Sequence, residues 1–111
     1  MKRMALAAIV ATTAVALAAP ARADVDTDFT NQLHSHGIYG QRDYNAWIGK
    51  ITCDRLGRGI DVDAYESTSF IIKNLPRHST TAQAWQFLGA AIDFYCPDLR
   101  RVLEQAAEQS G

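Results

Sequence analysis

The clearest helical pattern of apolar residues outside the N-terminal run lies between Thr80 and Pro97. Residues at i, i+4, i+7 and i+11 define one face, made of Trp85, Gly89, Ile92 and Cys96. A second stripe consists of Ala84, Phe87, Ala91 and Phe94. Thr80 and Gln83 have the spacing of a capping box, which marks a helix start. The pattern therefore predicts a helix that is buried on two sides.

A second segment with apolar residues on two faces runs from Gln41 to Leu56. Its narrow face of small residues ends in a cysteine and consists of Ala46, Gly49, Cys53 and Leu56. Its other face consists of Tyr44, Trp47, Ile48 and Ile51. Gly57 and Gly59 are expected to end the helix. We expect this helix to lie between neighbouring helices rather than on the surface.

Two shorter helices are predicted at the ends of the domain. Asp26 can cap a helix that carries Phe29 and Leu33 on one face, and Gly37 is suited to the C′ position that ends it, with Ile38 following. After Pro97, which is tolerated at the first position of a new helix, an amphipathic stripe predicts a last helix. Its members are Leu99, Val102, Leu103 and Ala106.

The segment from Asp61 to Leu75 has a mixed pattern. Asp63 and Glu66 are spaced as in a capping box, which favours a helix. The run from Ser67 to Ile72 has the β-branched and hydroxyl content of a strand. We predict a helix, because the chain offers no second strand for this one to pair with. The predicted fold is therefore all-α, a small bundle of four helices plus a short C-terminal helix.

The first 23 residues have the features of a secretory signal peptide. Lys2 and Arg3 precede an uncharged apolar run that ends at Pro20, and Ala21-Arg22-Ala23 resembles a signal peptidase site. The run is short for a membrane span, so we expect cleavage after Ala23 and no stable membrane anchor afterwards. The expected location of the mature protein is outside the cell or in the cell envelope.

Removal of 23 of the 111 residues leaves 88, enough for a single helical domain from 24 to 111. The leader contains three of the 11 basic residues and none of the 12 acidic ones, so the mature chain has a net charge of −4. Its basic residues are scattered apart from Arg100-Arg101. This charge distribution does not indicate a nucleic-acid partner.

The only two cysteines, Cys53 and Cys96, are expected to form a disulfide in an exported chain. Both are near the C-terminal ends of predicted helices. Short connections would make these two helices run in the same direction, and Gly49 and Gly89 would let their backbones approach closely. A redox pair and a metal site are the alternatives, but there is no C-x-x-C and no histidine at ligand spacing.

Three motifs carry a resemblance to a known family. They are Gly37-Ile38, the GKITCDRLGRG segment from Gly49 to Gly59, and the AAIDFYCP segment from Ala90 to Pro97. The chain resembles the domain-of-unknown-function family 732, small exported proteins typical of mycobacteria and related actinobacteria. The resemblance covers nearly all of the mature chain, with a core at about residues 26–97. It implies a secreted helical domain with a Cys53–Cys96 bridge, and no activity, cofactor or catalytic residue.

Histidines and tyrosines supply the alternative ligand sites. His34 and His36 are expected at a helix end, and they diverge on a helix unless it has already unwound at Gly37. His36, Tyr39 and Tyr44 are possible axial ligands for haem, and Trp47 could form a pocket wall. There is no C-x-x-C-H motif for covalent attachment. Haem or another small-ligand carrier is therefore the alternative function. His78 is expected in a loop.

An enzyme is the least favoured class. The serines Ser67, Ser69 and Ser79 are in no G-x-S-x-G turn, and Asp61 and Asp63 are interpreted as helix-start residues. The expectation that remains is an exported interaction module without a cofactor or a metal site. Its partner would be a protein, a peptide or a lipid held between helices.

Overall fold

The computed structural model describes residues 22–110, and within them every regular element is helical. The elements are α1 (Arg22–Ser35), α2 (Arg42–Gly57), α3 (Ala64–Asn74), α4 (Thr81–Tyr95), the 3₁₀-helix η2 (Pro97–Leu99) and α5 (Arg101–Ser110). The all-α prediction is confirmed, and the strand-like run from Ser67 to Ile72 is part of α3. The predicted signal peptide lies outside the described residues, except for Arg22 and Ala23.

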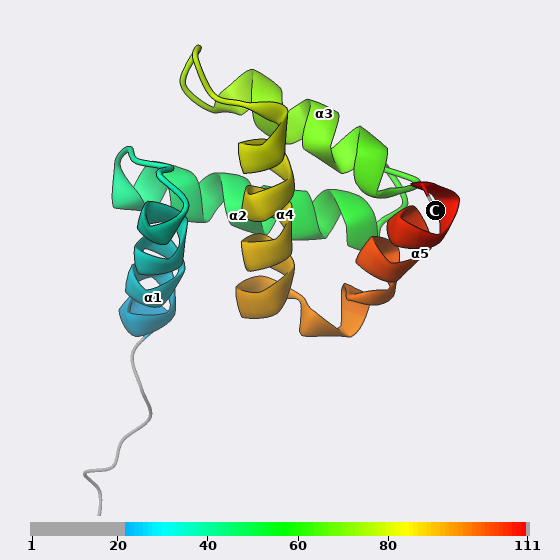
Figure 1. Ribbon diagram of the computed structural model, residues 1–111. Coiled ribbons are helices and arrows are strands. Elements are labelled where there is room, and N and C mark those ends of the chain that lie inside the picture. Colours follow the sequence, from blue (N-terminus) through cyan, green and yellow to red (C-terminus); the bar gives the residue numbers. More distant parts are fainter. Residues whose placement is uncertain (1–21, 111) are drawn as a thin grey trace, which may run out of the picture.

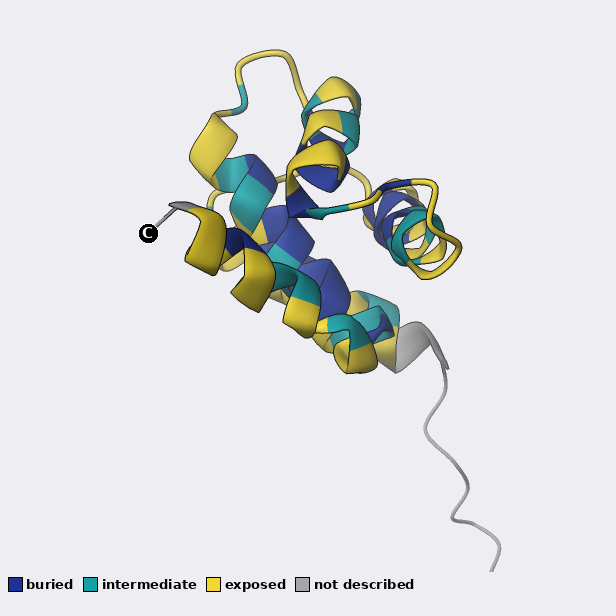
Figure 2. Cartoon of the chain, turned by 90° about the vertical axis from the view of Figure 1, so that its right-hand side faces the viewer, coloured by how far each residue is buried: buried dark blue, intermediate teal, exposed yellow. Residues whose placement is uncertain are grey.

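Helix α4 is the centre of the fold, and α1, α2 and α3 all pack against it (Figure 1). Its buried residues point in several directions around the helix: Ala84, Phe87, Leu88, Ala90, Ala91 and Ile92. Figure 2 shows the buried positions gathered where the helices face one another. The predicted burial of α4 on two sides is confirmed, and it follows from a sequence in which neighbouring stripes are both apolar.

The relative direction of α2 and α4 differs from the prediction. The two helices cross one another instead of running side by side in the same direction (Figure 1). The connections at residues 36–41, 58–63 and 75–80 are long enough to turn the chain through a wide angle. Because α4 needs cover on several sides, its neighbours lie across it, and ridge-into-groove packing permits such crossings.

The helix ends largely follow the predicted signals. Gly37 has a positive φ of 76°, and the N–H of Ile38 donates to the carbonyl of Leu33, as in a Schellman motif. Thr80 and Gln83 form the complete capping box of α4. Asp63 caps α3, whereas the Glu66 carboxylate accepts from the N–H of Val62 rather than from that of Asp63.

Asp26 does not cap a helix, because α1 begins upstream at Arg22 and Asp26 lies inside it. Its carboxylate instead accepts hydrogen bonds from the Tyr95 hydroxyl at 2.7 Å and from Lys50 Nζ at 3.3 Å. These bonds join α1 to α4 and to α2. Asp26, which the sequence pattern assigned to a helix cap, therefore bonds to residues that are far from it in the sequence.

One face of α2 was predicted to be buried and is only partly so. Trp47 is 58% exposed and Tyr44 is 39% exposed, and their rings contact each other edge to face. Ile48, on the same predicted face, is buried. Helix α2 does contact α1, α3 and α4, as expected for a helix between neighbours, but one aromatic edge remains in solvent.

The two glycines assigned to close backbone approach have different surroundings. At Gly49, the space that a Cβ would occupy lies 3.0 Å from a carbon of the Phe29 ring and 3.1 Å from a carbon of the Tyr95 ring. At Gly89, nothing lies within 4 Å of that space. Gly49 therefore accommodates aromatic rings, and the role predicted for Gly89 is wrong.

Candidate functional site

The predicted disulfide joins Cys53 in α2 to Cys96, the residue that ends α4. Their Cα atoms are 5.9 Å apart, and the two residues are separated by 43 positions in the sequence. Since both sulfurs are used in the bond, neither cysteine is a free nucleophile. Among the described residues there is also no group of three or more His, Cys, Asp and Glu side chains arranged to hold a metal ion.

The three haem-ligand candidates are used in separate local contacts. His36 Nε2 lies 3.3 Å from Gln32 Nε2 one turn earlier. The ring of Tyr39 lies 5.2 Å from that of His34. The hydroxyl of Tyr44 donates to the backbone carbonyl of Asn74, at the end of α3. The described arrangement therefore does not bring His36, Tyr39 and Tyr44 together around one cavity.

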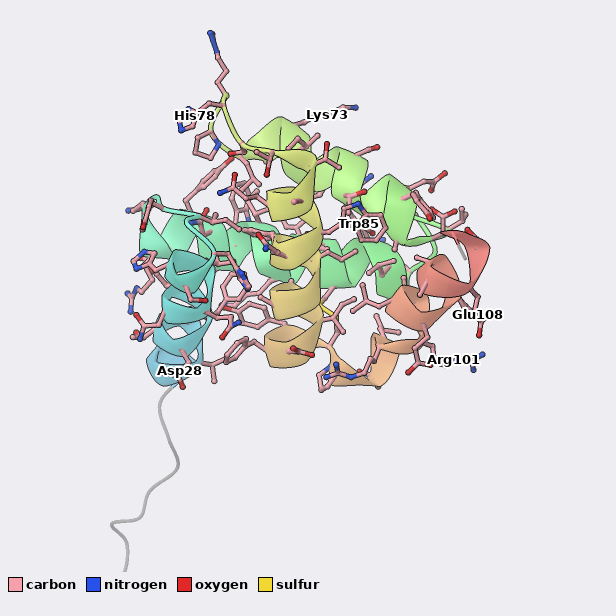
Figure 3. All side chains as sticks on the ribbon, viewed as in Figure 1. Asp28, Lys73, His78, Trp85, Arg101 and Glu108 are labelled. Atoms are coloured by element: carbon pink, nitrogen blue, oxygen red, sulfur yellow. A yellow bond between two sulfur atoms is a disulfide. The ribbon has the colours of Figure 1, made fainter. Side chains whose placement is uncertain are left out.

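Tyr39 does line a small cavity, but with residues that the sequence pattern did not associate with it. The loop between α1 and α2 meets the loop between α3 and α4 there, around a volume of about 280 Å³ that His78 and Gln83 also line. Gln83 Nε2 donates to the carbonyls of His36 and Gly37, which holds the loops together. His78 is in a loop, as predicted, at the edge of the molecule (Figure 3).

A polar cluster joins Asp26, Lys50 and Tyr95. Besides its bond to Asp26, Lys50 Nζ lies 5.5 Å from the centre of the Tyr95 ring. Burial and the hydrogen bond to Asp26 raise the pKa of Tyr95. Burial raises the pKa of Asp26, but the hydrogen bonds from Tyr95 and Lys50 outweigh it and leave that pKa below its ordinary value. The cluster favours a neutral phenol beside a carboxylate, which suits a structural tie.

A second polar cluster replaces the helix-start role predicted for Asp61. This carboxylate is buried and accepts from Arg55 Nε at 3.0 Å, from Arg55 Nη2 at 2.8 Å and from Ser67 Oγ at 3.0 Å. The hydrogen bond to Asp61 raises the pKa of Arg55, whose guanidinium also lies 4.3 Å from the centre of the Phe70 ring. The Asp61 carboxylate is buried and Arg55 is partly exposed, and their two-point ion pair fixes the connection between α2 and α3.

An apolar pocket of about 390 Å³ lies between α3, α4 and α5. Tyr65 of α3 and Trp85 of α4 form one side, with ring centres 5.1 Å apart and planes nearly perpendicular. The other side is formed by α5 through Leu103, Ala106 and Ala107. In Figure 3, Trp85 extends from α4 toward the part of the molecule where α5 lies. No charged side chain is among these lining residues.

The sequence pattern placed three of the five lining residues, Trp85, Leu103 and Ala106, in helical stripes and did not group them as a site. Trp85 was assigned to a buried face, although it is only partly buried. The hydroxyl of Tyr65 donates to the carbonyl of Ala106 at 3.4 Å, a contact between α3 and α5. The available signal was the presence of two large aromatics opposite a helix rich in alanine. These residues can be recognised as a pocket only when the crossing of the helices is known.

None of the helices formed by residues 22–110 is long and apolar enough to cross a membrane. This finding concerns the described helices alone. It leaves the predicted leader, which precedes them, outside its scope.

The comparisons with known proteins agree with the motifs around the two cysteines. The family model described as protein of unknown function (DUF732) matches residues 25–98. Two uncharacterized proteins of Mycobacterium tuberculosis, MT0585 of strain CDC 1551 and Rv0559c of strain H37Rv, are each 57% identical over 109 residues. Each alignment covers 96% of this chain and 97% of the relative. No solved structure matches the chain. The chain therefore belongs to the DUF732 family of proteins of unknown function.

Proposed function

We propose that this protein is an exported binding module, and that its ligand site is the apolar pocket between α3, α4 and α5. The observation that carries the proposal is the pair Tyr65–Trp85, which faces Leu103, Ala106 and Ala107 across the cavity. Ligand sites are typically concave and mostly apolar, and often aromatic. A volume of about 390 Å³ is near the lower end of their usual range, so the ligand is small.

The proposal assigns binding rather than catalysis to this protein. Its two cysteines are joined, and Ser67 Oγ donates to Asp61, which is itself paired with Arg55. Neither arrangement leaves a nucleophile next to a free base. The disulfide instead suits a small domain that must keep its shape outside the cell, where disulfides persist.

Export rests on the leader pattern, and it can be tested separately from binding. We expect the protein in culture filtrate or in the envelope fraction to begin at Asp24, since cleavage is predicted after Ala23. N-terminal sequencing of the purified product measures this directly. A product that retains Met1 in the membrane fraction would contradict export by signal cleavage.

Binding can be tested with Nile red, a neutral apolar dye whose emission rises in apolar surroundings. The oxidised mature domain carrying Trp47→Phe leaves Trp85 as the only tryptophan, so quenching of its fluorescence reports on the pocket. We expect saturable binding that Ala107→Phe weakens at least tenfold, because the added ring occupies the cavity.

The matched control is Gln105→Phe, which adds the same ring at an exposed position outside the pocket lining. This variant should bind Nile red as the parent does. Equal binding by all three proteins would show that the dye binds elsewhere, and the proposed site would then be wrong. A complete absence of binding in the parent would contradict the proposal in the same way.

A further inference from the structure

The wall of the pocket formed by α5 lies outside the segment that defines the family. The family model ends at residue 98, and α5 begins at Arg101. Helices α1 to α4 and both cysteines lie within the matched segment, apart from the first residues of α1. Three of the five lining residues nevertheless come from α5. The shape of the pocket therefore depends on a helix that the family model does not include.

Helix α5 packs against the core through a few inner residues, among them Val102, Leu103 and Ala106. It contacts α3 and η2, and Ala106 is its single buried residue among those whose burial is described. The Tyr65 hydroxyl reaches the carbonyl of Ala106, and no ion pair among the described residues involves α5. The preceding residues, in contrast, are anchored by Cys96. Substitutions on the inner side of α5 can therefore change the pocket while the disulfide-linked core remains.

The chemistry of the lining restricts the ligand. The walls present aromatic rings, a leucine and two alanines, and the Tyr65 hydroxyl is already hydrogen-bonded to the backbone. A charged group placed here would lose its hydration without gaining an opposite charge, which is costly. An apolar chain or ring, in contrast, gains from contact with Trp85 and Leu103.

From these observations we infer that the pocket selects neutral, apolar small molecules over charged ones, and that α5 provides the residues that set this choice. Ala107 is the position where this can be tested most cleanly. It lines the pocket, yet its residue is exposed, so a longer side chain can be accommodated without displacing the core. The inference rests on the binding function proposed above and adds the ligand class and its determinant.

The experiment uses two ten-carbon competitors, 1-decanol and decanoate, to displace Nile red from the oxidised mature protein near neutral pH. The two differ chiefly in the charge of the head group. We expect decanol to displace the dye at a concentration at least tenfold below that needed for decanoate. Circular dichroism and melting, recorded for each variant, verify that the fold is retained.

Ala107→Lys should remove this preference, because an ammonium at the pocket can pair with a carboxylate. We expect the ratio of the decanoate concentration to the decanol concentration needed to displace the dye to fall at least tenfold in this variant. Gln105→Lys, with the same change of charge at an exposed position outside the lining, should keep the preference of the parent. A change confined to Ala107→Lys would identify α5 as the determinant, since a general loss of stability would not improve decanoate binding.

The outcomes separate this inference from the proposed function. If decanol and decanoate displace the dye from the parent equally well, the proposed ligand class is wrong. If Ala107→Lys and Gln105→Lys behave alike, the proposed role of α5 is wrong. The pocket itself would still stand if Ala107→Phe weakens Nile red binding. If Ala107→Phe leaves Nile red binding unchanged, the binding site and the inference both fail.

Discussion

Individual side chains that bond to residues far away in the sequence hold the helices in place. Tyr95 connects the last turn of α4 to Asp26 in α1, and Lys50 of α2 joins the same carboxylate. The sequence pattern assigned Asp26 to a helix cap and gave Tyr95 no role. Such a contact has no local signature, because the two residues are 69 positions apart and meet only after folding.

Replacing Tyr95 with phenylalanine should lower the free energy of unfolding by about 1–2 kcal/mol at pH 8. This is toward the lower end of the contribution of a hydrogen bond to a charged group, because Tyr95 is only partly buried. The pKa of Tyr95 is raised in the folded protein by burial and by Asp26. Its stabilisation is therefore complete below the pKa of an exposed tyrosine, about 10, and declines as the pH rises above that value. The difference in the free energy of unfolding between the wild type and Tyr95→Phe should therefore be smaller at pH 11 than at pH 8, by about 1 kcal/mol.

Guanidinium unfolding of both proteins at pH 8 and at pH 11 measures this narrowing. Tyr39→Phe is the control at pH 8, because Tyr39 is 62% exposed and its hydroxyl has no hydrogen bond within the described part of the chain. That variant should unfold like the wild type. A constant difference between the wild type and Tyr95→Phe across the pH range would disprove the role assigned to the Asp26–Tyr95 bond.

At the level of helices, the sequence predicted where helices end better than it predicted which residues surround them. The capping box at Thr80 and the glycine at Gly37 were predicted correctly, because capping depends on residues a few positions apart. The surroundings of Gly49 and Gly89 could not be predicted in this way. Gly49 lies four positions before Cys53 and Gly89 lies seven positions before Cys96, each on the helix face that carries the cysteine. Their different environments depend on how α2 and α4 cross, which the sequence pattern does not show.

Alanine substitutions at these two glycines should have opposite effects. Each removes the helix penalty of an interior glycine, worth about 0.8–1.0 kcal/mol. Gly89→Ala should therefore raise the free energy of unfolding by about 0.5–1 kcal/mol, because the added methyl group has space. Gly49→Ala should lower it by about 1 kcal/mol, because the methyl group meets the rings of Phe29 and Tyr95. Urea titration of the two variants checks this, and changes of the same sign would contradict it.

The disulfide between α2 and α4 should be the covalent feature on which the fold depends most. The Cys53→Ser/Cys96→Ser double variant should lose about 2–5 kcal/mol, because the bridge restricts the unfolded chain. Replacing His34, His36 and His78 together should leave the fold nearly intact, since all three are at a helix end or in loops. Thermal melting with and without a chelator compares the two variants. A double-serine variant that melts like the wild type, or a protein that chelator destabilises, would refute this assignment.

At the scale of the whole molecule, the class and the cross-link followed from the sequence, but the arrangement of the helices did not. Two cysteines leave one possible pairing, and helical periodicity is a local property. The direction of α4 relative to α2 is decided by how several apolar faces are covered at once. The pocket was missed for the same reason, because Tyr65, Trp85 and Leu103 come from three helices.

The most direct test of the account is to map where a neutral apolar ligand binds on the oxidised mature domain by two-dimensional amide NMR with Nile red. The account predicts shift changes concentrated around Tyr65, Trp85 and the inner side of α5, with the loops at Tyr39 and His78 unaffected. Shift changes centred on those loops, or on the exposed Trp47, would contradict the assignment of the binding site to the pocket between α3, α4 and α5.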